Sequence, residues 1–212
     1  MKILYIDTTT SYLYTGLVVD SHLISEVKED FGKDLSSVAL KKIQEMLTTN
    51  QLEPADIDKI IVVNGPGSFT GIRVGITIAK TFAYSLNKNI TTITSLEAMA
   101  LSSKEDTKIK IPLIDARRGY IYGAIYGENL SQILKPQYLK LETLKCAQEN
   151  LLEDYTYISN QEFEDINIEK YNPDIEKIVN TCSNRENINP HAVNPIYLKM
   201  TEAEEKQNLE II

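Results

Sequence analysis

Runs of apolar residues predict an α/β protein that opens with three antiparallel strands. The runs cover residues 3–7, 12–19 and 22–27. The polar segments between them, 8–11 and 20–21, have the length of hairpin turns. Strands and helices alternate after these hairpins, which is typical of an α/β fold.

Two predicted helices in the first half have unusually wide apolar arcs. One runs from Asp34, a residue type that caps helix N-termini, to about Thr48, and the other from about Ile72 to Leu86. In each helix the apolar residues span roughly 200° of the helical wheel, about twice the stripe that one buried face needs. We therefore expect a second buried surface on each, covered either by another layer of this chain or by a partner protein.

The segment between the predicted strand 56–63 and the second helix has the sequence NGPGSFTGIRVG and is rich in glycine. Such a loop brings backbone N–H groups to a helix N-terminus, where a phosphate or carboxylate binds. The same glycines fit a tight turn that packs a strand onto a helix equally well. Two known phosphate loops are excluded. Arg73 follows Gly71 and Ile72 where a Walker A loop has Lys-Ser/Thr, and Thr70 replaces the third glycine of the dinucleotide fingerprint.

A near repeat indicates that the chain contains two related lobes. Residues 114–125 (IDARRGYIYGAI) match residues 6–17 (IDTTTSYLYTGL) without a gap, at an offset of about half the chain. Chance similarity of two hairpins is the alternative. The polar stretch SSKEDTK lies between the two halves and predicts lobes over 1–107 and 108–212. The further predicted elements are strands at 90–94, 130–134 and 155–159, helices at 96–101, 142–152 and 173–182, an irregular segment at 160–172, and a closing segment at 196–200.

Charge and composition limit the candidate functions. The chain has 22 Lys and Arg against 30 Asp and Glu, a net charge of −8, which argues against tight nucleic-acid binding by this chain alone. Cys146 and Cys182 form no CxxC pair, and His22 and His191 form no ligand pair, so we expect reduced thiols and no metal site. The absence of a signal peptide and of a long apolar segment predicts a cytoplasmic protein without membrane contact.

Four motifs, in the order IDTTT, GPGSFTGIRVG, IDARRGYIYGAIY and PIYLK, resemble the TsaB (YeaZ) family over nearly the whole chain, with residues 137–190 the least similar. Two lobes that each begin with a hairpin and an early Asp also resemble the actin/hexokinase/Hsp70-like (ASKHA) ATPase fold. The family resemblance implies this two-lobed α/β fold with a degenerate second lobe.

The resemblance also implies a function. TsaB-like proteins are noncatalytic scaffold or dimerisation subunits of the bacterial machinery that makes N6-threonylcarbamoyladenosine beside the tRNA anticodon. A TsaD-type subunit performs the transfer and a TsaE-type P-loop ATPase joins the pair, so ATP and metal are expected in the partners and no cofactor in this chain. We expect tRNA contact only through the complex, and a homodimer is possible when the chain is alone. The expected partner interface comprises Leu35, Val38, Ala39, Val74, Gly75, Ile78 and Phe82.

The sequence departs from the family at two places. Many relatives have His-Ser near the start of the first helix, where this chain has Asp34, Leu35 and Ser36, and the loop after Ser159 lacks the glycines that would hold an adenosine. We therefore favour a role as structural turns for the residues that match a phosphate-facing cleft. These residues are Asp7, Thr8, Gly65, Gly67, Ser68 and Gly71.

An enzyme is the alternative. A stand-alone kinase or ATPase of this fold would use Asp7 or Asp115 to hold a metal and the glycine loop to hold a phosphate. A protease would need a metal pair or a nucleophile with a base, and the two isolated histidines provide neither.

Overall fold

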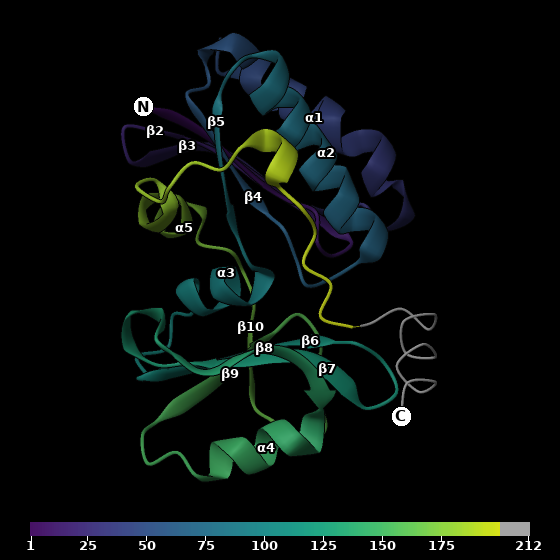
Figure 1. Cartoon of the computed structure of the whole chain (residues 1–212), viewed down its shortest axis with the longest axis vertical. Helices are drawn as coiled ribbons and strands as arrows, with labels where there is room; N and C mark the ends of the chain where they lie inside the picture. Colours follow the sequence, from purple (N-terminus) through teal and green to yellow (C-terminus); the bar gives the residue numbers. More distant parts are fainter. Residues whose placement is uncertain (200–212) are drawn as a thin grey trace.

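A computed structural model describes residues 1–199 and divides them into two lobes, each built on a five-stranded sheet (Figure 1). The first sheet has the order β3-β2-β1-β4-β5 and the second the order β10-β9-β6-β7-β8. The strands of the first are β1 (Lys2–Asp7), β2 (Tyr12–Val19), β3 (His22–Asp30), β4 (Lys59–Val63) and β5 (Asn89–Ile93). Those of the second are β6 (Ile109–Asp115), β7 (Tyr120–Tyr126), β8 (Gln132–Lys140), β9 (Tyr155–Ser159) and β10 (Ile168–Lys170).

The two sheets have the same topology. In each, three antiparallel strands come first, and the next two strands run parallel to the first one. The repeat seen in the sequence is therefore a duplicated lobe, and the predicted ASKHA-like fold is confirmed. The hairpin registers differ by one residue, because Asp7 pairs with Tyr14 whereas Asp115 pairs with Ile121.

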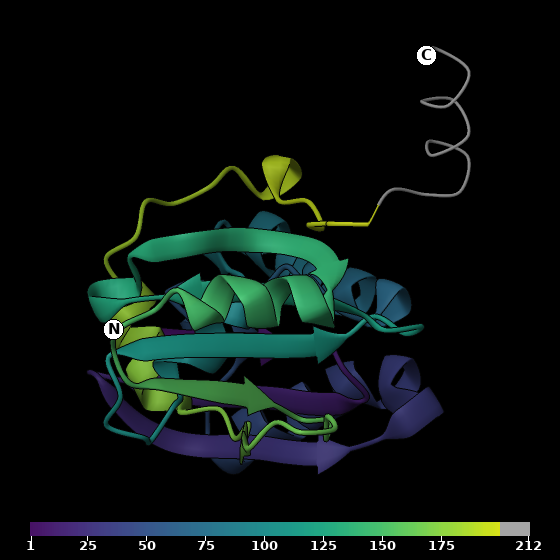
Figure 2. The ribbon, with the colours of Figure 1, turned by 90° about the horizontal axis from the view of Figure 1, so that it is seen from below.

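Helices cover the sheets on both sides. Helices α1 (Leu35–Thr49) and α2 (Phe69–Ser85) lie side by side on one face of the first sheet (Figure 1). Helix α4 (Leu141–Glu149) crosses the outer face of the second sheet (Figure 2). Helices α3 (Ser95–Leu101) and α5 (Ile175–Cys182) lie between the two sheets. Short 3-10 turns occur at Gly32–Asp34, Pro54–Asp56, Glu128–Leu130 and Pro190–Ala192.

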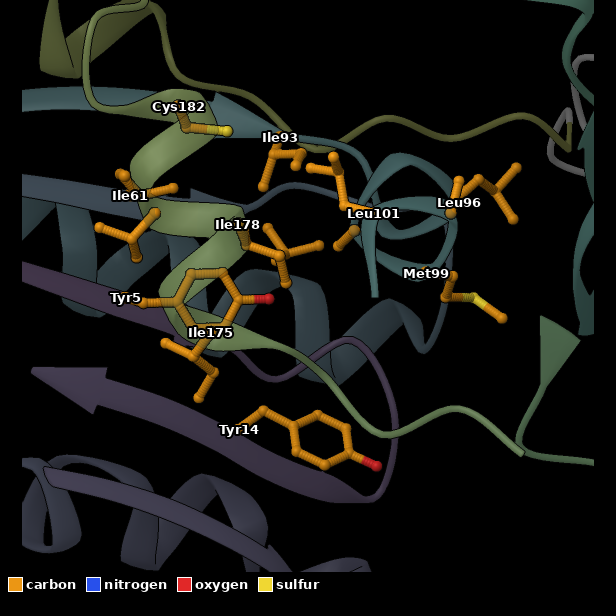
Figure 3. Close-up of a cluster of buried hydrophobic side chains, with 14 of the residues drawn as sticks. Tyr5, Tyr14, Ile61, Ile93, Leu96, Met99, Leu101, Ile175, Ile178 and Cys182 are labelled. Atoms are coloured by element: carbon orange, nitrogen blue, oxygen red, sulfur yellow. The ribbon is translucent and has the colours of Figure 1, made fainter. Parts of the chain in front are cut away.

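The core between the lobes joins them through exchanged helices. Helix α3 follows the first sheet in sequence but packs on β6, β7 and β9, while α5 follows the second sheet and packs on β1, β2, β3 and β5. Buried side chains from both helices, such as Leu101 of α3 and Ile178 of α5, meet there with Tyr5 of β1 (Figure 3). Because apolar burial favours association, this shared core fixes the lobes against each other.

The second lobe lacks one helix that the first lobe has. Between β4 and β5 the first lobe has the glycine loop and α2, whereas residues 160–167 connect β9 to β10 without a helix. The remaining elements correspond in order, with α4 matching α1 and α5 matching α3. The second lobe is therefore degenerate at one defined place.

The last described segment, residues 183–199, returns to the first lobe, and we call it the C-terminal strap. The Ile188 amide donates to the Ile90 carbonyl at 2.8 Å, and the Ile196 amide to that of Asn64 at 2.7 Å. The Lys59 ammonium donates to the Ser183 carbonyl at 2.9 Å. A division at residue 107 therefore separates the two sheets, but residues 108–199 do not form one spatial unit.

Several predicted boundaries need correction. Helix α2 begins at Phe69 rather than Ile72, because the Ser68 hydroxyl caps it by accepting from the Gly71 amide. Asp34 precedes α1 but its side chain makes no capping bond. The strand predicted at 130–134 is β8, and β10 lies in a segment predicted to be irregular. Residues 196–199 form no regular element, and residue 200 of that predicted segment lies outside the described range.

Candidate functional site

The glycines of the loop and of α2 allow the helix to approach the β1–β2 hairpin closely. A Cβ atom added at Gly67 would overlap the Thr9 carbonyl oxygen, and one at Gly71 would overlap that of Thr8. At Gly75 it would overlap the Thr8 hydroxyl. The three glycines, one in the loop and two in α2, are spaced by four residues and allow a close approach to Thr8 and Thr9 that a side chain would prevent.

Hydrogen bonds also fix the β1–β2 hairpin against the glycine loop and α2. The Thr8 hydroxyl donates to the Gly71 carbonyl at 2.7 Å, and the Ser68 amide donates to the Thr9 carbonyl at 2.7 Å. The Gly71 amide donates to the Ser68 hydroxyl at 3.3 Å. Two amides that a bound phosphate would use are therefore occupied by the chain itself, which favours the role of the loop as a packing turn.

The two matching acids of the repeat lie in different environments. Asp7 is buried, and its Oδ1 accepts from the Thr9 amide at 2.8 Å and the Thr9 hydroxyl at 2.7 Å. Loss of hydration on burial raises the pKa of Asp7, although the bonds from Thr9 oppose this shift. Asp115 is exposed and accepts from the Arg117 amide at 2.9 Å. The repeat therefore places one acid in the core and its counterpart at the surface.

A polar cleft lies between the lobes and has a volume of about 630 Å³. Of the six candidate residues, Gly67 and Ser68 line it, together with Thr9, Asp115 and Gln161. Asp7 instead lines a separate void of about 20 Å³ beneath. Gly65 has φ +110°, and a Cβ there would press on the Ile196 carbonyl of the C-terminal strap. Only some of the residues that match a phosphate-facing cleft in sequence therefore lie at the cleft surface.

An apolar groove lies between the outer faces of α1 and α2, with a volume of about 450 Å³. Leu40 of α1 is 51% exposed and Phe69 of α2 is 54% exposed. We call this surface the helix groove. Its lining residues are Ser36, Leu40, Phe69, Thr70, Arg73, Val74, Thr77 and Ile78.

The expected interface residues divide into two groups. Val74 and Ile78 line the helix groove, and Val38 and Phe82 are half-buried. Leu35, Ala39 and Gly75 are buried. Leu35 and Ala39 pack with Leu13 of β2, and Gly75 contacts Thr8, so the expectation that these three face a partner is corrected. The first sheet of the chain itself covers part of each wide apolar arc. Helical periodicity alone does not show which part of the arc faces this sheet and which part lies on the outer face.

Sequence patterns alone do not reveal one cluster at the rim of the helix groove. The Arg73 guanidinium lies 3.7 Å from the centroid of the Phe69 ring and donates to the Tyr197 hydroxyl at 2.9 Å. The Phe69 and Tyr197 rings stack at 5.3 Å. Tyr197 belongs to the PIYLK motif, so the sequence did point to this residue. Its position beside α2, however, depends on the path of the C-terminal strap.

Comparisons with known proteins identify the family. A family model described as TsaD, tRNA N6-adenosine threonylcarbamoyltransferase, matches residues 27–178. The tRNA threonylcarbamoyladenosine biosynthesis protein TsaB of Bacillus subtilis is 31% identical over 97% of both chains. The chain belongs to the TsaB (YeaZ) family. The TsaB of Escherichia coli is 32% identical over 65% of this chain and 64% of its own.

Solved structures agree with the fold of this TsaB family member. YeaZ from Pseudomonas aeruginosa superposes with a TM-score of 0.73 at 17% identity, and a second structure, titled as similar to peptidase YEAZ from that organism, with a TM-score of 0.76. Each comparison covers 93% of this chain and 99% of the other.

Two further features of this TsaB-family chain concern metal ions and membranes. Within residues 1–199, no group of three or more His, Cys, Asp or Glu side chains could hold a metal ion. No helix in the same range is long and apolar enough to cross a membrane. Cys182 is buried, and burial raises the pKa of its thiol to about 11, while Cys146 is exposed. The surroundings of Cys182 therefore do not activate its thiol as a nucleophile.

Proposed function

We propose that this chain is a noncatalytic scaffold subunit in the biosynthesis of tRNA threonylcarbamoyladenosine, and that it docks a TsaD-type catalytic subunit on the helix groove. Family membership supports the pathway, since the Bacillus subtilis and Escherichia coli relatives carry that name. The observation that supports the docking site is the exposed apolar lining of the groove, with Leu40 and Phe69 more than half exposed.

Apolar burial would supply the affinity of this contact. Complete burial of a Leu or Phe side chain contributes about 1.5 to 3 kcal/mol, so removing the exposed halves of Leu40 and Phe69 from water contributes on the order of 1 kcal/mol each. Single exposed apolar residues are common, but a contiguous groove of them is typical of an interaction site. When the partner is absent, a second copy of the chain could cover the same groove, which would make the homodimer and the complex mutually exclusive.

The proposed complex divides the work among its subunits. The TsaD-type subunit would hold the metal and transfer the threonylcarbamoyl group to the tRNA, and a TsaE-type ATPase would bind ATP. This chain would bind no cofactor and would keep its partner in a working arrangement. The alternative of a stand-alone kinase or ATPase is disfavoured, because the Ser68 and Gly71 amides are occupied within the chain.

The test is a pair of matched substitutions. Leu40→Asp places a charge in the groove, and Ile133→Asp places one on edge strand β8 at the same 51% exposure. Both variants should fold, because both side chains already face water. Leu40→Asp should weaken binding to the TsaD-type subunit at least a hundredfold in calorimetric titration and stop threonylcarbamoyladenosine formation in a reconstituted mixture.

Ile133→Asp should leave the binding affinity and the modification unchanged. Equal partner binding by the Leu40→Asp variant and the unmodified chain would mean that the partner docks elsewhere. Micromolar ATP binding by the isolated chain, lost in Asp7→Ala, would favour the kinase or ATPase.

A further inference from the structure

Three tyrosines form a stacked cluster on the second lobe, which we call the tyrosine platform. The rings of Tyr120 and Tyr138 are parallel within 11° at 4.7 Å between centroids, and Tyr122 lies 5.7 Å from Tyr138. Tyr122 and Tyr138 are direct partners across β7 and β8. The intervening pair, Ile121 and Leu139, faces the opposite side into the core of the second lobe.

Tyr122 packs against the core between the lobes, whereas Tyr120 and Tyr138 belong to none of the buried clusters of the described residues. All three tyrosines are only half-buried. Within the described residues, their hydroxyl groups make no hydrogen bond to side chain or backbone. Tyr122 also lines the cleft between the lobes, next to Phe69 of the first lobe and Arg117. The platform therefore offers aromatic surface at the mouth of an open, polar cleft.

Basic side chains surround the platform although the whole chain has a net charge of −8. Lys140 is the cross-strand partner of Tyr120, and the Lys199 ammonium lies 5.5 Å from the centroid of the Tyr138 ring. Arg117 and Arg118 lie at the tip of the β6–β7 hairpin, separated from Tyr120 by Gly119. Two acids are near this rim in sequence: Asp115, whose carboxylate accepts from the Arg117 amide, and the exposed Glu142, two residues after Lys140.

The hairpin tip presents its arginines at an energetic cost. Arg117 and Arg118 have φ of +69° and +58°, a left-handed conformation that Gly or Asn adopts more readily. Both are exposed, and neither guanidinium forms an ion pair within residues 1–199. A turn selected for stability alone would favour other residue types at these positions.

We infer that the tyrosine platform and its basic rim (Arg117, Arg118, Lys140 and Lys199) bind a single-stranded segment of RNA. Arg and Lys neutralise phosphates, and exposed aromatic rings stack on unpaired bases, so this combination is typical of single-strand recognition. A paired duplex keeps its bases stacked on each other and would gain only the phosphate contacts. The choice of RNA over DNA rests on the proposed function.

The net acidic charge limits this contact to a contribution within the complex. The isolated chain should bind weakly, and the patch would guide or orient an RNA loop that a TsaD-type partner also holds. The patch adjoins the helix groove, because Phe69 lines both the groove and the cleft, and Tyr197, which stacks on Phe69, lies two residues before Lys199. RNA bound at the patch would therefore lie beside a partner docked on the helix groove.

The experiment measures binding of the isolated full chain to a labelled RNA hairpin with an unpaired loop, by fluorescence anisotropy at low salt, with a fully paired RNA duplex as comparison. Arg117→Asn with Arg118→Asn removes two charges and suits the left-handed backbone, so the fold should be kept. Affinity for the hairpin should fall at least tenfold. The slope of log K against log salt should decrease in magnitude by about 1.4, as expected for two contacts to single-stranded phosphates.

Two further pairs of variants separate charge from stacking. Lys104→Gln with Lys177→Gln removes the same charge from exposed sites elsewhere and should leave hairpin binding within twofold. Tyr138→Leu should weaken hairpin binding about tenfold and duplex binding little, whereas Tyr138→Phe should retain both.

The inference is wrong if the arginine variant binds the hairpin as tightly as the unmodified chain, or if the lysine control loses as much. It is also wrong if the arginine variant binds RNA normally but loses the TsaD-type partner, since the patch would then be a protein-docking surface. Partner binding by the unmodified chain is measured separately, so a failure of the proposed function appears there and not in the RNA titration.

Discussion

The two lobes share a topology but differ at the connection that follows the fourth strand of each. In the first lobe a glycine loop and α2 make this connection, and in the second lobe residues 160–167 do so without a helix. The first lobe therefore has a helix pair with an outer groove, whereas α4 alone packs on the corresponding face of the second sheet. The duplicated unit thus forms a helix groove in one copy only, because the other copy lacks one helix.

The largest expected effect concerns the close packing of α2 against the β1–β2 hairpin. The test compares a glycine of the first lobe with a glycine of the second lobe. A Cβ at Gly71 would overlap the Thr8 carbonyl oxygen, whereas one at Gly119 would meet no atom within 4 Å. Gly71→Ala should lower the free energy of unfolding by about 3 kcal/mol because the helix must move away from the hairpin. Gly119→Ala has only the strain of its φ of +75° and should lose about 1 kcal/mol.

Chemical denaturation of both glycine variants checks this difference. Equal losses would mean that α2 can shift without cost and that the glycines at 67, 71 and 75 do not fix its position. Loss of nucleotide binding in Gly71→Ala with unchanged stability would assign the loop to a ligand instead.

A smaller effect concerns Asp7, the buried acid of the repeat. Burial raises the folded-state pKa of Asp7 above its ordinary value of 3.8, so the folded chain holds this proton more tightly than the unfolded chain. The stabilisation is complete below that ordinary value and is lost as the pH rises through the raised pKa. Asp7→Asn does not titrate, so its stability relative to the unmodified chain should increase with pH.

Denaturation of Asp7→Asn and of the unmodified chain at several pH values measures this effect. A decrease in the relative stability of Asp7→Asn towards neutral pH would mean that the Asp7 carboxylate is stabilised in its charged form.

The smallest effect concerns the C-terminal strap. Tyr197→Ala removes a stacked ring and a hydrogen-bond partner of Arg73 and should lower the free energy of unfolding by about 0.5 to 1 kcal/mol. Tyr197→Phe keeps the stacking and should retain most of that stability. If Tyr197→Phe loses as much stability as Tyr197→Ala, the effect comes from the hydroxyl rather than from the ring.

Local pattern predicted most of the elements but not their mutual packing. The hairpins, α1, α3, α5 and the repeat of Asp7 at Asp115 followed from periodicity and motif, because they depend on nearby residues. The three-residue strand β10 was missed because it is too short to show a pattern and is held by pairing with β9. The path of the strap was also missed, since its bonds join residues more than 90 apart in sequence.

The candidate site shows the same limit. Helical periodicity identified α1 and α2 as two-faced, but it assigned Leu35, Ala39 and Gly75 to the partner side when the first lobe itself buries them. Phe69 was placed in a loop, so its exposed ring was not considered. Which part of an apolar arc stays free depends on the geometry of the sheet beneath it.

Hydrogen exchange of the chain with and without a TsaD-type partner tests the central claim most directly. Binding should slow exchange at the exposed N-terminal half of α1, residues 36–40, and along α2, residues 69–78, with no change in α4. Protection confined to the second lobe, with the helix groove unaffected, would contradict the assignment of this groove as the docking surface.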